Sequence, residues 1–359
     1  MIKQLADKYF SIVKTFIPEK RVNKPSVGLD IGSSSCKAIE IMPIDGGFTI
    51  LNWLTEPLDP KKPADAVKKI IEKLSIEVKS IATAVGGQGT LIRYIDMPKM
   101  PLADAKKSFA LEADKYFPFA KEQIYTDCFI VDSNLQENKM SLLVAAAKKE
   151  IIDQRMKLLT EVGLQADFIG LNSLAIANVF NVLGSSSIKP GPQTDTMKAS
   201  AVAILDIGNA VTSLIILKDG VPRFTRDIFV GGRELNERIG NVLGVDVREA
   251  EKIKRQPGAQ LENVLNASDS ILMNLVSEIR LSFDYFVTEK NTQVSKLYLT
   301  GGSSAFEKLV DFFGKNLEIP VEKWNPLGPF KLLSTVSASD IQKNASYLGV
   351  ALGLALYQQ

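Results

Sequence analysis

The sequence predicts an α/β protein built from two similar lobes. One apolar run ends in Asp30-Ile31-Gly32, and another ends in Asp206-Ile207-Gly208. Each is followed by small or hydroxyl residues and then by a second apolar run, which is typical of two buried strands joined by a tight turn. The two copies lie roughly half the chain length apart, and 359 residues are enough for two such lobes.

Each of these turns has the chemistry to bind a phosphate. Gly32 and Gly208 let a ligand approach the backbone closely, and the N–H groups of such a turn can cradle phosphate oxygens. Neighbouring polar side chains supply further donors, namely Ser33, Ser34, Ser35, Lys37, Asn209 and Thr212. The alternative is that each copy is only a hairpin turn. The repetition favours a phosphate site shared by the two lobes.

An aspartate precedes each turn glycine. A carboxylate in this position is poorly placed to contact a phosphate but well placed to hold Mg²⁺, usually through water, because Mg²⁺ prefers oxygen ligands and retains several waters. Asp30 and Asp206 are therefore predicted to orient one magnesium ion.

Composition excludes several classes of function. The net charge of +2 does not favour nucleic-acid binding. The absence of histidine excludes Ser-His and Cys-His catalysis as well as histidine-ligated metals. Two cysteines, Cys36 and Cys128, indicate a reducing compartment rather than a disulfide framework. The longest apolar stretch, 347–357, is too short to span a bilayer, and no secretory signal is expected.

The first 24 residues are predicted to form an amphipathic helix and a linker. Apolar residues of 2–17 fall on one half of a helical wheel, and Pro18 ends the pattern. Two interpretations stay open. The helix packs on this protein or on a partner, or it lies in a membrane interface with help from Lys20 and Arg21.

The first lobe is expected over residues 25–184. Three strands in 27–54 are followed by a helix at 63–75 and a strand at 81–85. Gly86-Gly87-Gln88-Gly89 is not a P-loop, because no Gly-Lys-Ser/Thr follows it. It leads into an inserted unit, 90–147, and the lobe then resumes. In the inserted unit we predict a strand at 90–97, a helix at 102–116 and strands at 124–131 and 140–147. In the resumed lobe we predict a helix at 148–162 and a strand turning into a helix over 165–183.

Residues 185–200 are predicted to form an exposed loop, and 201–359 a second lobe. Its helical part, about 226–296, contains helices at 232–243, 246–255 and 267–289. The pair Gly231-Gly232 marks the entry to the first of these helices and is predicted to contact the nucleotide. After a strand at 296–299, a helix beginning at Gly301-Gly302-Ser303 is expected to contact an anion or nucleotide. A small-residue helix, 344–357, closes the chain and is expected to pack back toward the first lobe.

The order of these motifs resembles the actin, Hsp70 and hexokinase superfamily, whose fold is a duplicated ribonuclease H-like ATPase. The matching segments are 28–35, 169–183, 206–213, 301–302 and 346–356. The resemblance implies ATP and Mg²⁺ as ligands. It also implies that Glu251 and Lys254 contact the nucleotide, whereas an exposed charged helix face is the alternative.

The inserted unit is similar to that of the FtsA and PilM families, and its details favour the PilM family. The segments 91–98, 112–119 and 225–228 match that family's signatures. The resemblance implies a cytoplasmic, ATP-binding adaptor at the inner membrane that binds the N-terminal peptide of a PilN-like bitopic protein during type IV pilus assembly. The implied peptide groove contains Arg93, Met97, Pro98, Phe109 and Phe117, each of which is alternatively a core residue.

Hydrolysis requires a residue that positions or activates water. The resemblance places Asn172 near that position, where an amide can orient a water but cannot take its proton. Weak or absent ATP hydrolysis is therefore expected. The alternatives are an FtsA-like cell-division protein or another self-associating filament protein, and a superfamily kinase, for which the sequence shows no signature.

Overall fold

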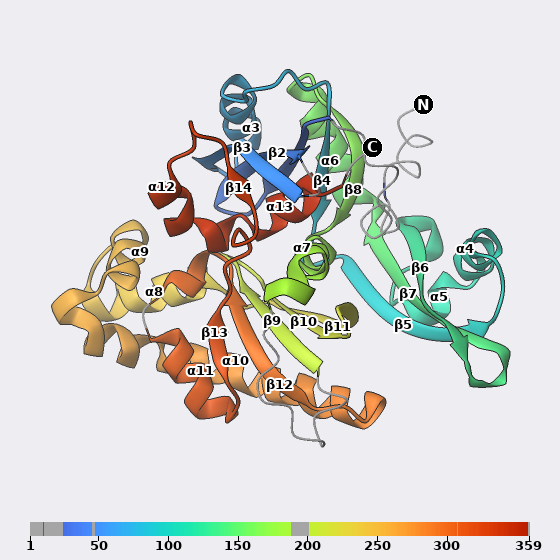
Figure 1. Cartoon of the computed structure of the whole chain (residues 1–359). Helices are drawn as coiled ribbons and strands as arrows, with labels where there is room; N and C mark the ends of the chain where they lie inside the picture. Colours follow the sequence, from blue (N-terminus) through green and yellow to red (C-terminus); the bar gives the residue numbers. More distant parts are fainter. Residues whose placement is uncertain (1–9, 11–23, 45–46, 188–200, 307, 358–359) are drawn as a thin grey trace. The chain divides into compact units, whose positions relative to one another are not determined.

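The computed structural model describes residue 10 and residues 24–44, 47–187, 201–306 and 308–357. It contains two compact units (Figure 1). The first comprises 1–185, 326–344 and 348–359, and the second comprises 186–325 and 345–347. Residues 326–344, expected in the second lobe, group with the first unit. The two-residue strand β14 (Lys331–Leu332) within this segment pairs with a strand of the first unit's sheet.

A six-stranded sheet forms the centre of the first unit. Its strands follow the order β14-β3-β2-β1-β4-β8. The strands β1, β2 and β3 form an antiparallel meander, whereas β4 and β8 run parallel to β1. Their bounds are β1 Ser26–Ile31, β2 Ser35–Ile44, β3 Gly47–Pro57, β4 Ser80–Val85 and β8 Gln165–Leu171. The unit's longer helices are α3 Pro63–Glu72, α6 Lys149–Glu161 and α7 Asn172–Ser187, and two shorter ones near the chain's end are α12 Ala338–Lys343 and α13 Gly349–Ala355.

The second unit repeats this topology. Its five-stranded sheet has the order β11-β10-β9-β12-β13, again with a three-stranded antiparallel meander followed by two parallel strands. Apart from β14, the two sheets therefore have the same strand order and directions. The strands are β9 Ala201–Ile207, β10 Thr212–Lys218, β11 Val221–Ile228, β12 Val294–Thr300 and β13 Val321–Lys323, and the helices are α8 Gly232–Leu243, α9 Val247–Arg255, α10 Leu261–Lys290 and α11 Leu309–Leu317.

The inserted unit lies between β4 and α6 and contains an antiparallel sheet with the order β5-β7-β6. Alternate residues of these strands face opposite sides. One side packs under the two helices of the insert, and the other joins the core of the first unit's main sheet. The bounds are β5 Thr90–Pro98, α4 Leu102–Leu111, α5 Ala113–Tyr116, β6 Ile124–Leu135 and β7 Lys139–Lys148.

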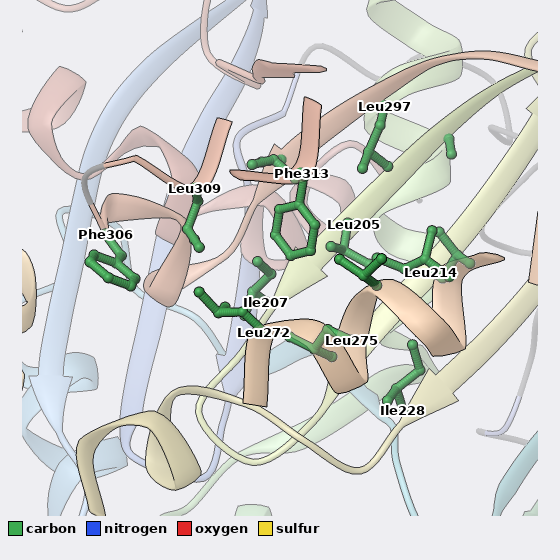
Figure 2. Packing of buried hydrophobic residues seen from close by; sticks show 14 of the residues in the cluster. Leu205, Ile207, Leu214, Ile228, Leu272, Leu275, Leu297, Phe306, Leu309 and Phe313 are labelled. Atoms are coloured by element: carbon green, nitrogen blue, oxygen red, sulfur yellow. The ribbon is translucent and has the colours of Figure 1, made fainter. Parts of the chain in front are cut away.

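Apolar residues from the sheet and helices form the core of the second unit. Figure 2 shows Leu205 and Ile207 of β9 and Leu214 of β10 close to Leu275 of α10 and Phe313 of α11. All five are fully buried. Burying a side chain of this size stabilises the fold by about 1.5–3 kcal/mol, so this cluster fixes the sheet that carries the second Asp-Ile-Gly turn.

Two glycines allow the expected close packing of the last helix, α13, in the first unit. A Cβ on Gly28 of β1 would lie 1.9 Å from the carbonyl oxygen of Ala351, and one on Gly353 would lie 1.9 Å from that of Ala175 in α7. The backbones therefore approach to distances that any side chain would prevent. The Asn178 amide group also donates a hydrogen bond to Gly353 O at 3.2 Å.

Several element boundaries differ from those predicted. The helix expected over 102–116 is interrupted at Glu112, whose N–H bonds to Phe109 O three residues earlier and so tightens the turn between α4 and α5. The long helix expected from 267 begins at Leu261. The helix α7 continues to Ser187, into the predicted loop 185–200.

The glycine pair at 301–302 does not begin an α-helix, contrary to prediction. Gly301 has φ +86°, and only a four-residue 3₁₀ turn, Gly302–Ala305, follows it before the chain extends at Phe306. The final helix is also shorter than predicted, because a 3₁₀ turn at Ala345–Tyr347 precedes α13.

Most of the N-terminal segment, 1–24, the turn residues 45–46 and most of the loop 185–200 lie outside the described residues. The exception within the predicted helix is Phe10, which is 4% exposed, belongs to the core of the first unit and forms a parallel β-bridge with Ile169. Among the described helices, none combines the length and the apolar character needed to cross a bilayer.

Candidate functional site

The first Asp-Ile-Gly turn is a tight hairpin between β1 and β2. Its closing hydrogen bond runs from Gly32 N to Ser35 O at 3.1 Å, and Leu58 N donates to Ser34 O at 2.9 Å. Ser33 and Ser34 are exposed, as the phosphate prediction requires. A Cβ on Gly32 would lie only 3.1 Å from Ser35 O, so glycine keeps this turn compact.

Asp30 is buried at the end of β1 and forms an ion pair with Lys37, its cross-strand neighbour on β2. The two residues are register partners, and Lys37 Nζ lies 2.8 Å from Asp30 Oδ2. Both predicted binding residues therefore lie at the same hairpin. The lysine neutralises the carboxylate in the structure as it stands.

Arg155 of α6 lies beside this hairpin, and the sequence analysis did not identify it. Its guanidinium group donates to three oxygens: Nη2 to Ile31 O at 3.1 Å, and Nη1 to Thr83 Oγ1 and Ala84 O, both at 2.9 Å. Burial lowers the pKa of Arg155, while the nearby Asp30 carboxylate opposes this shift.

Asn172 is the first residue of α7 and follows directly on β8. A Cβ on Gly86, at the end of β4, would lie 2.9 Å from the Asn172 amide nitrogen. The amide oxygen is buried and has no hydrogen-bond partner within the described part of the chain. Asn172 therefore lies at the same edge of the sheet as the ends of β4 and β8, with an acceptor available for a water or a ligand.

The second hairpin is stabilised by the backbone of the first two residues of α8. Gly232 N donates to Gly208 O at 2.9 Å, and Arg233 N donates to Asn209 O at 2.8 Å. A Cβ on Gly231 would lie 2.8 Å from both of these carbonyl oxygens. The structure therefore gives this predicted glycine pair a supporting role at the turn.

Thr212 was predicted to offer its hydroxyl to a phosphate, and the structure contradicts this. The side chain is fully buried, and Oγ1 donates to Val230 O at 2.7 Å. The hydroxyl proton is therefore used to join β10 to the segment that follows β11. Ser303 also faces inward, and its Oγ donates to Gly208 O at 3.3 Å.

Gly301 packs against the aspartate of the second hairpin. A Cβ on Gly301 would lie 2.4 Å from Asp206 Oδ1 and 2.6 Å from Ile207 N. Gly302 lies against the ring of Tyr347, whose nearest atom would be 3.0 Å from a Cβ. The predicted residues Asp206, Gly301 and Gly302 are therefore brought together, although by a turn that uses the positive φ of Gly301 rather than by a helix terminus.

Residues of α8 and α9 in the second unit form a partly buried charge cluster. Lys254 Nζ lies 2.6 Å from Glu251 Oε2, which also accepts from the Asn236 amide at 2.7 Å. Arg255 Nε binds Glu251 Oε1 at 2.6 Å, and its guanidinium carbon lies 5.1 Å from the Tyr347 ring centroid. Asn236, Arg255 and Tyr347 were not singled out from the sequence, because their partners become neighbours only in the fold.

These contacts shift the ionisation of the cluster. Burial raises the pKa of Glu251, but the charge of Lys254 and the hydrogen bonds it accepts outweigh this, so the net shift is downward. Burial lowers the pKa of Lys254, and Glu251 only partly offsets that effect. Because Lys254 is 1% exposed, the alternative of a solvated charged helix face does not apply to it.

The predicted peptide-groove residues separate into two groups. Phe109 and Phe117 are buried in the core of the inserted unit, with ring centroids 6.0 Å apart. Arg93 and Pro98 on β5 are exposed, and Met97 is partly buried. The two phenylalanines are therefore core residues, and the β5 side chains are the accessible ones.

Within the described part of the chain, no group of three or more acidic or cysteine side chains could hold a metal on its own. Asp30 and Asp206 are single carboxylates in different units. The thiol of Cys36, beside Asp30, is not reactive, because burial raises its pKa to about 12. A carboxylate in contact with a phosphate-binding turn fits a water-mediated Mg²⁺ site, in which the phosphates supply the other ligands.

Two units with the same strand order, each with an Asp-Ile-Gly hairpin, define an actin-like ATPase fold with an inserted subdomain. The family model for the type IV pilus assembly protein PilM matches residues 28–359. The chain belongs to the PilM family, as the inserted unit indicated.

Two solved structures resemble this fold. A structure titled the PilM-PilN type IV pilus biogenesis complex is 24% identical and has a TM-score of 0.80, covering 94% of this chain and 98% of that chain. The ethanolamine utilization protein EutJ of Carboxydothermus hydrogenoformans is 13% identical with a TM-score of 0.54, covering 95% and 93%. At these identities both structures support the fold.

The cell division protein FtsA of Pseudomonas aeruginosa is 24% identical over 219 residues. The match covers 54% of this chain and 48% of FtsA, and so spans about half the length of that protein.

Proposed function

We propose that this protein is an ATP-binding adaptor in type IV pilus assembly. The observation that carries the proposal is the repeated hairpin. In a chain of the PilM family, both units place an aspartate and a compact glycine turn at the end of the first strand of the sheet. Such turns present N–H groups to phosphate oxygens.

In this proposal, each unit supplies nucleotide-binding groups of its own. The exposed turn residues Ser33 and Ser34, together with Lys37, contact phosphates, as do the backbone groups of Gly208 and Asn209. Asp30 and Asp206 hold Mg²⁺ through water, and the ion neutralises phosphate charge. The nucleoside lies beside Gly301 and Gly302. The charge cluster of the second unit lies near it and consists of Asn236, Glu251, Lys254, Arg255 and Tyr347.

ATP serves mainly as a bound ligand in this proposal, because the residue near the water position is Asn172. Its amide oxygen can accept a hydrogen bond from water and orient it, but an amide does not act as a general base. Turnover is expected to stay below about 1 per second, the lower end of ordinary enzymes. The Asn172→Asp variant, which supplies a base, is expected to release phosphate faster.

Isothermal titration with ATP and Mg²⁺ tests nucleotide binding. The wild-type chain is expected to bind, and Asp206→Ala to bind at least tenfold more weakly in the presence of Mg²⁺. Arg238→Ala, at an exposed position of α8, is the control. The absence of binding by the wild-type chain would contradict the proposal.

The partner is proposed to be the N-terminal cytoplasmic peptide of a PilN-like bitopic membrane protein, which places this chain at the inner membrane. β5 supports this proposal. It pairs only with β7 in the described sheet and is therefore an edge strand. An exposed edge can bind an extended peptide through main-chain hydrogen bonds.

The side chains on the face of β5 that packs against the insert's own core are incompletely covered, so a peptide along this edge could contact them. Leu91, Ile95 and Met97 are partly buried, and Arg93 is exposed between them. An apolar peptide with an acidic residue fits this pattern. The predicted N-terminal helix is an additional candidate for membrane contact, and liposome sedimentation with and without residues 1–24 tests that contact.

Self-association is the second candidate, and one observation favours it. Leu281 and Tyr285 of α10 and Phe229, just after β11, are more than half exposed. A second copy of the chain would shield these apolar side chains from water. Light scattering with and without ATP tests this, and an unchanged monomer mass at high protein concentration would contradict it.

A further inference from the structure

Arg155 is the strongest feature that the proposed function does not use. A guanidinium group has five N–H donors in a rigid plane, so it can fix several acceptors relative to one another. Here it joins the ends of two strands. One acceptor, Ile31 O, belongs to β1, and the other two, Thr83 Oγ1 and Ala84 O, belong to β4.

The contact with Ile31 acts directly on the turn. The carbonyl group of Ile31 and the N–H group of Gly32 belong to the same peptide plane. Arg155 binds the carbonyl end at 3.1 Å, and Ser35 O accepts from the N–H end at 3.1 Å. The peptide that begins the turn is therefore fixed from both ends.

The network extends behind the hairpin. Thr83 is fully buried, and its hydroxyl donates to Leu29 O at 2.7 Å while accepting from Arg155. Two carbonyl groups of β1 are thus connected to the same guanidinium group, Ile31 O directly and Leu29 O through the Thr83 hydroxyl. Removing the guanidinium group would take a hydrogen-bond donor from both Ile31 O and Ala84 O and so loosen the end of β1.

The second hairpin is supported differently. Its carbonyl groups accept from the backbone N–H groups of Gly232 and Arg233, so main chain takes the place of the arginine. Arg155 also belongs to α6, which follows the central strand of the inserted sheet without an intervening residue. The support for the first hairpin is therefore supplied by the helix that leaves the inserted unit.

We propose that Arg155 is a positioning residue that holds the first phosphate-binding hairpin in its binding geometry. This rests on the proposed function, in that the hairpin binds the phosphates of ATP. Arg155 itself binds protein oxygens and acts through the turn. Loss of Arg155 is expected to weaken the binding of ATP, which has phosphates, and to leave the binding of adenosine, which has none, unchanged.

Three variants of the full chain test the proposal. Arg155→Met removes the donors and the charge, and Arg155→Lys keeps the charge but not the planar fork. Lys157→Met removes an exposed cation two residues further along α6 and is the matched control. Hydrogen–deuterium exchange of residues 28–37 without nucleotide is the first readout. Titrations with ATP and with adenosine form the second.

Arg155→Met is expected to exchange at the hairpin about tenfold faster, which corresponds to a local opening made easier by about 1.4 kcal/mol. Its ATP affinity is expected to fall about tenfold with adenosine affinity within twofold of wild type. Arg155→Lys should recover part of both effects, and Lys157→Met should change neither.

If the exchange rate at the hairpin is the same in Arg155→Met as in wild type, the proposal is overturned. An equal loss of ATP affinity and adenosine affinity would also overturn it, because such a loss indicates general unfolding. If the wild-type chain binds neither ligand, the proposed function fails. The exchange readout still decides whether Arg155 positions the hairpin, since it uses no nucleotide.

Discussion

Lys254 is buried against Glu251, with 2.6 Å between Nζ and Oε2 and 1% of the lysine side chain exposed. A buried ion pair is expensive to break from one side, because the remaining charge stays buried without a partner. The two residues are not equivalent here. Glu251 has further partners in Asn236 and Arg255, whereas Lys254 depends on Glu251.

Glu251→Ala should therefore destabilise the second unit more than Lys254→Met. We expect a loss of about 3 kcal/mol in the free energy of unfolding for the first change and about 1 kcal/mol for the second. The chain has two tryptophans, Trp53 in the first unit and Trp324 in the second. Urea unfolding followed by Trp324 fluorescence in a Trp53→Phe background measures the difference. Equal losses of unfolding free energy in the two variants would contradict the conclusion that Lys254 depends on Glu251 more than Glu251 depends on Lys254.

The same cluster predicts the effect of acid. The pKa of Glu251 lies below its ordinary value of 4.5 in the folded chain. Its stabilising contribution is therefore fully present above pH 4.5 and is lost as the pH falls through the folded pKa. Between roughly pH 5 and pH 3, the stability of the second unit should fall less steeply in Glu251→Gln than in wild type. Identical slopes would show that Glu251 does not titrate differently on folding.

Gly301 should not tolerate a methyl group. Alanine at this position combines a positive φ of +86° with contacts of 2.4–2.6 Å to Asp206 and Ile207. Gly301→Ala is expected to cost about 3 kcal/mol and to abolish ATP binding, because it displaces the second hairpin. Gly244→Ala is the matched control, with φ +69° but open space around the Cβ, and it should cost about 1 kcal/mol. Trp324 fluorescence measures the unfolding of both variants. Similar losses of unfolding free energy in the two would mean that the positive φ, and not the close contacts at Gly301, sets the cost.

Gly353 offers a parallel test in the first unit. Gly353→Ala would force α13 away from α7, because the new Cβ would lie 1.9 Å from Ala175 O. The expected loss is at least about 3 kcal/mol, measured by Trp53 fluorescence in a Trp324→Phe background. Gly47→Ala, where φ is not positive and the nearest atom to the new Cβ is Ile44 O at 3.8 Å, controls for the substitution itself. If Gly353→Ala has the same unfolding midpoint as the wild-type chain, α13 can move away from α7 without loss of stability.

The sequence was sufficient for the features that depend on local pattern. The Asp-Ile-Gly turns and the alternation of apolar runs predicted the two similar sheets, because a strand's burial and a tight turn are set by neighbouring residues. The inserted unit was predicted over 90–147 from the same kind of pattern, and in the structure β5 begins at Thr90 and β7 ends at Lys148.

Features set by distant contacts were not predictable in this way. Arg155 binds a carbonyl 124 positions earlier in the chain, so no local pattern identifies it. Thr212 looked available beside the turn, but its hydroxyl direction depends on Val230, which only the sheet brings near. Phe109 and Phe117 likewise matched an expected groove in sequence, whereas packing of α4 and α5 on the insert's sheet buries both.

Titration of the N-terminal peptide of the PilN-like partner into the full chain, with and without ATP, tests the central proposal most directly. The account predicts binding by wild type and at least tenfold weaker binding by Arg93→Glu. Binding is expected to be unchanged in Lys107→Glu, an exposed charge reversal on α4. Failure of the wild-type chain to bind the peptide under both conditions would contradict the adaptor function.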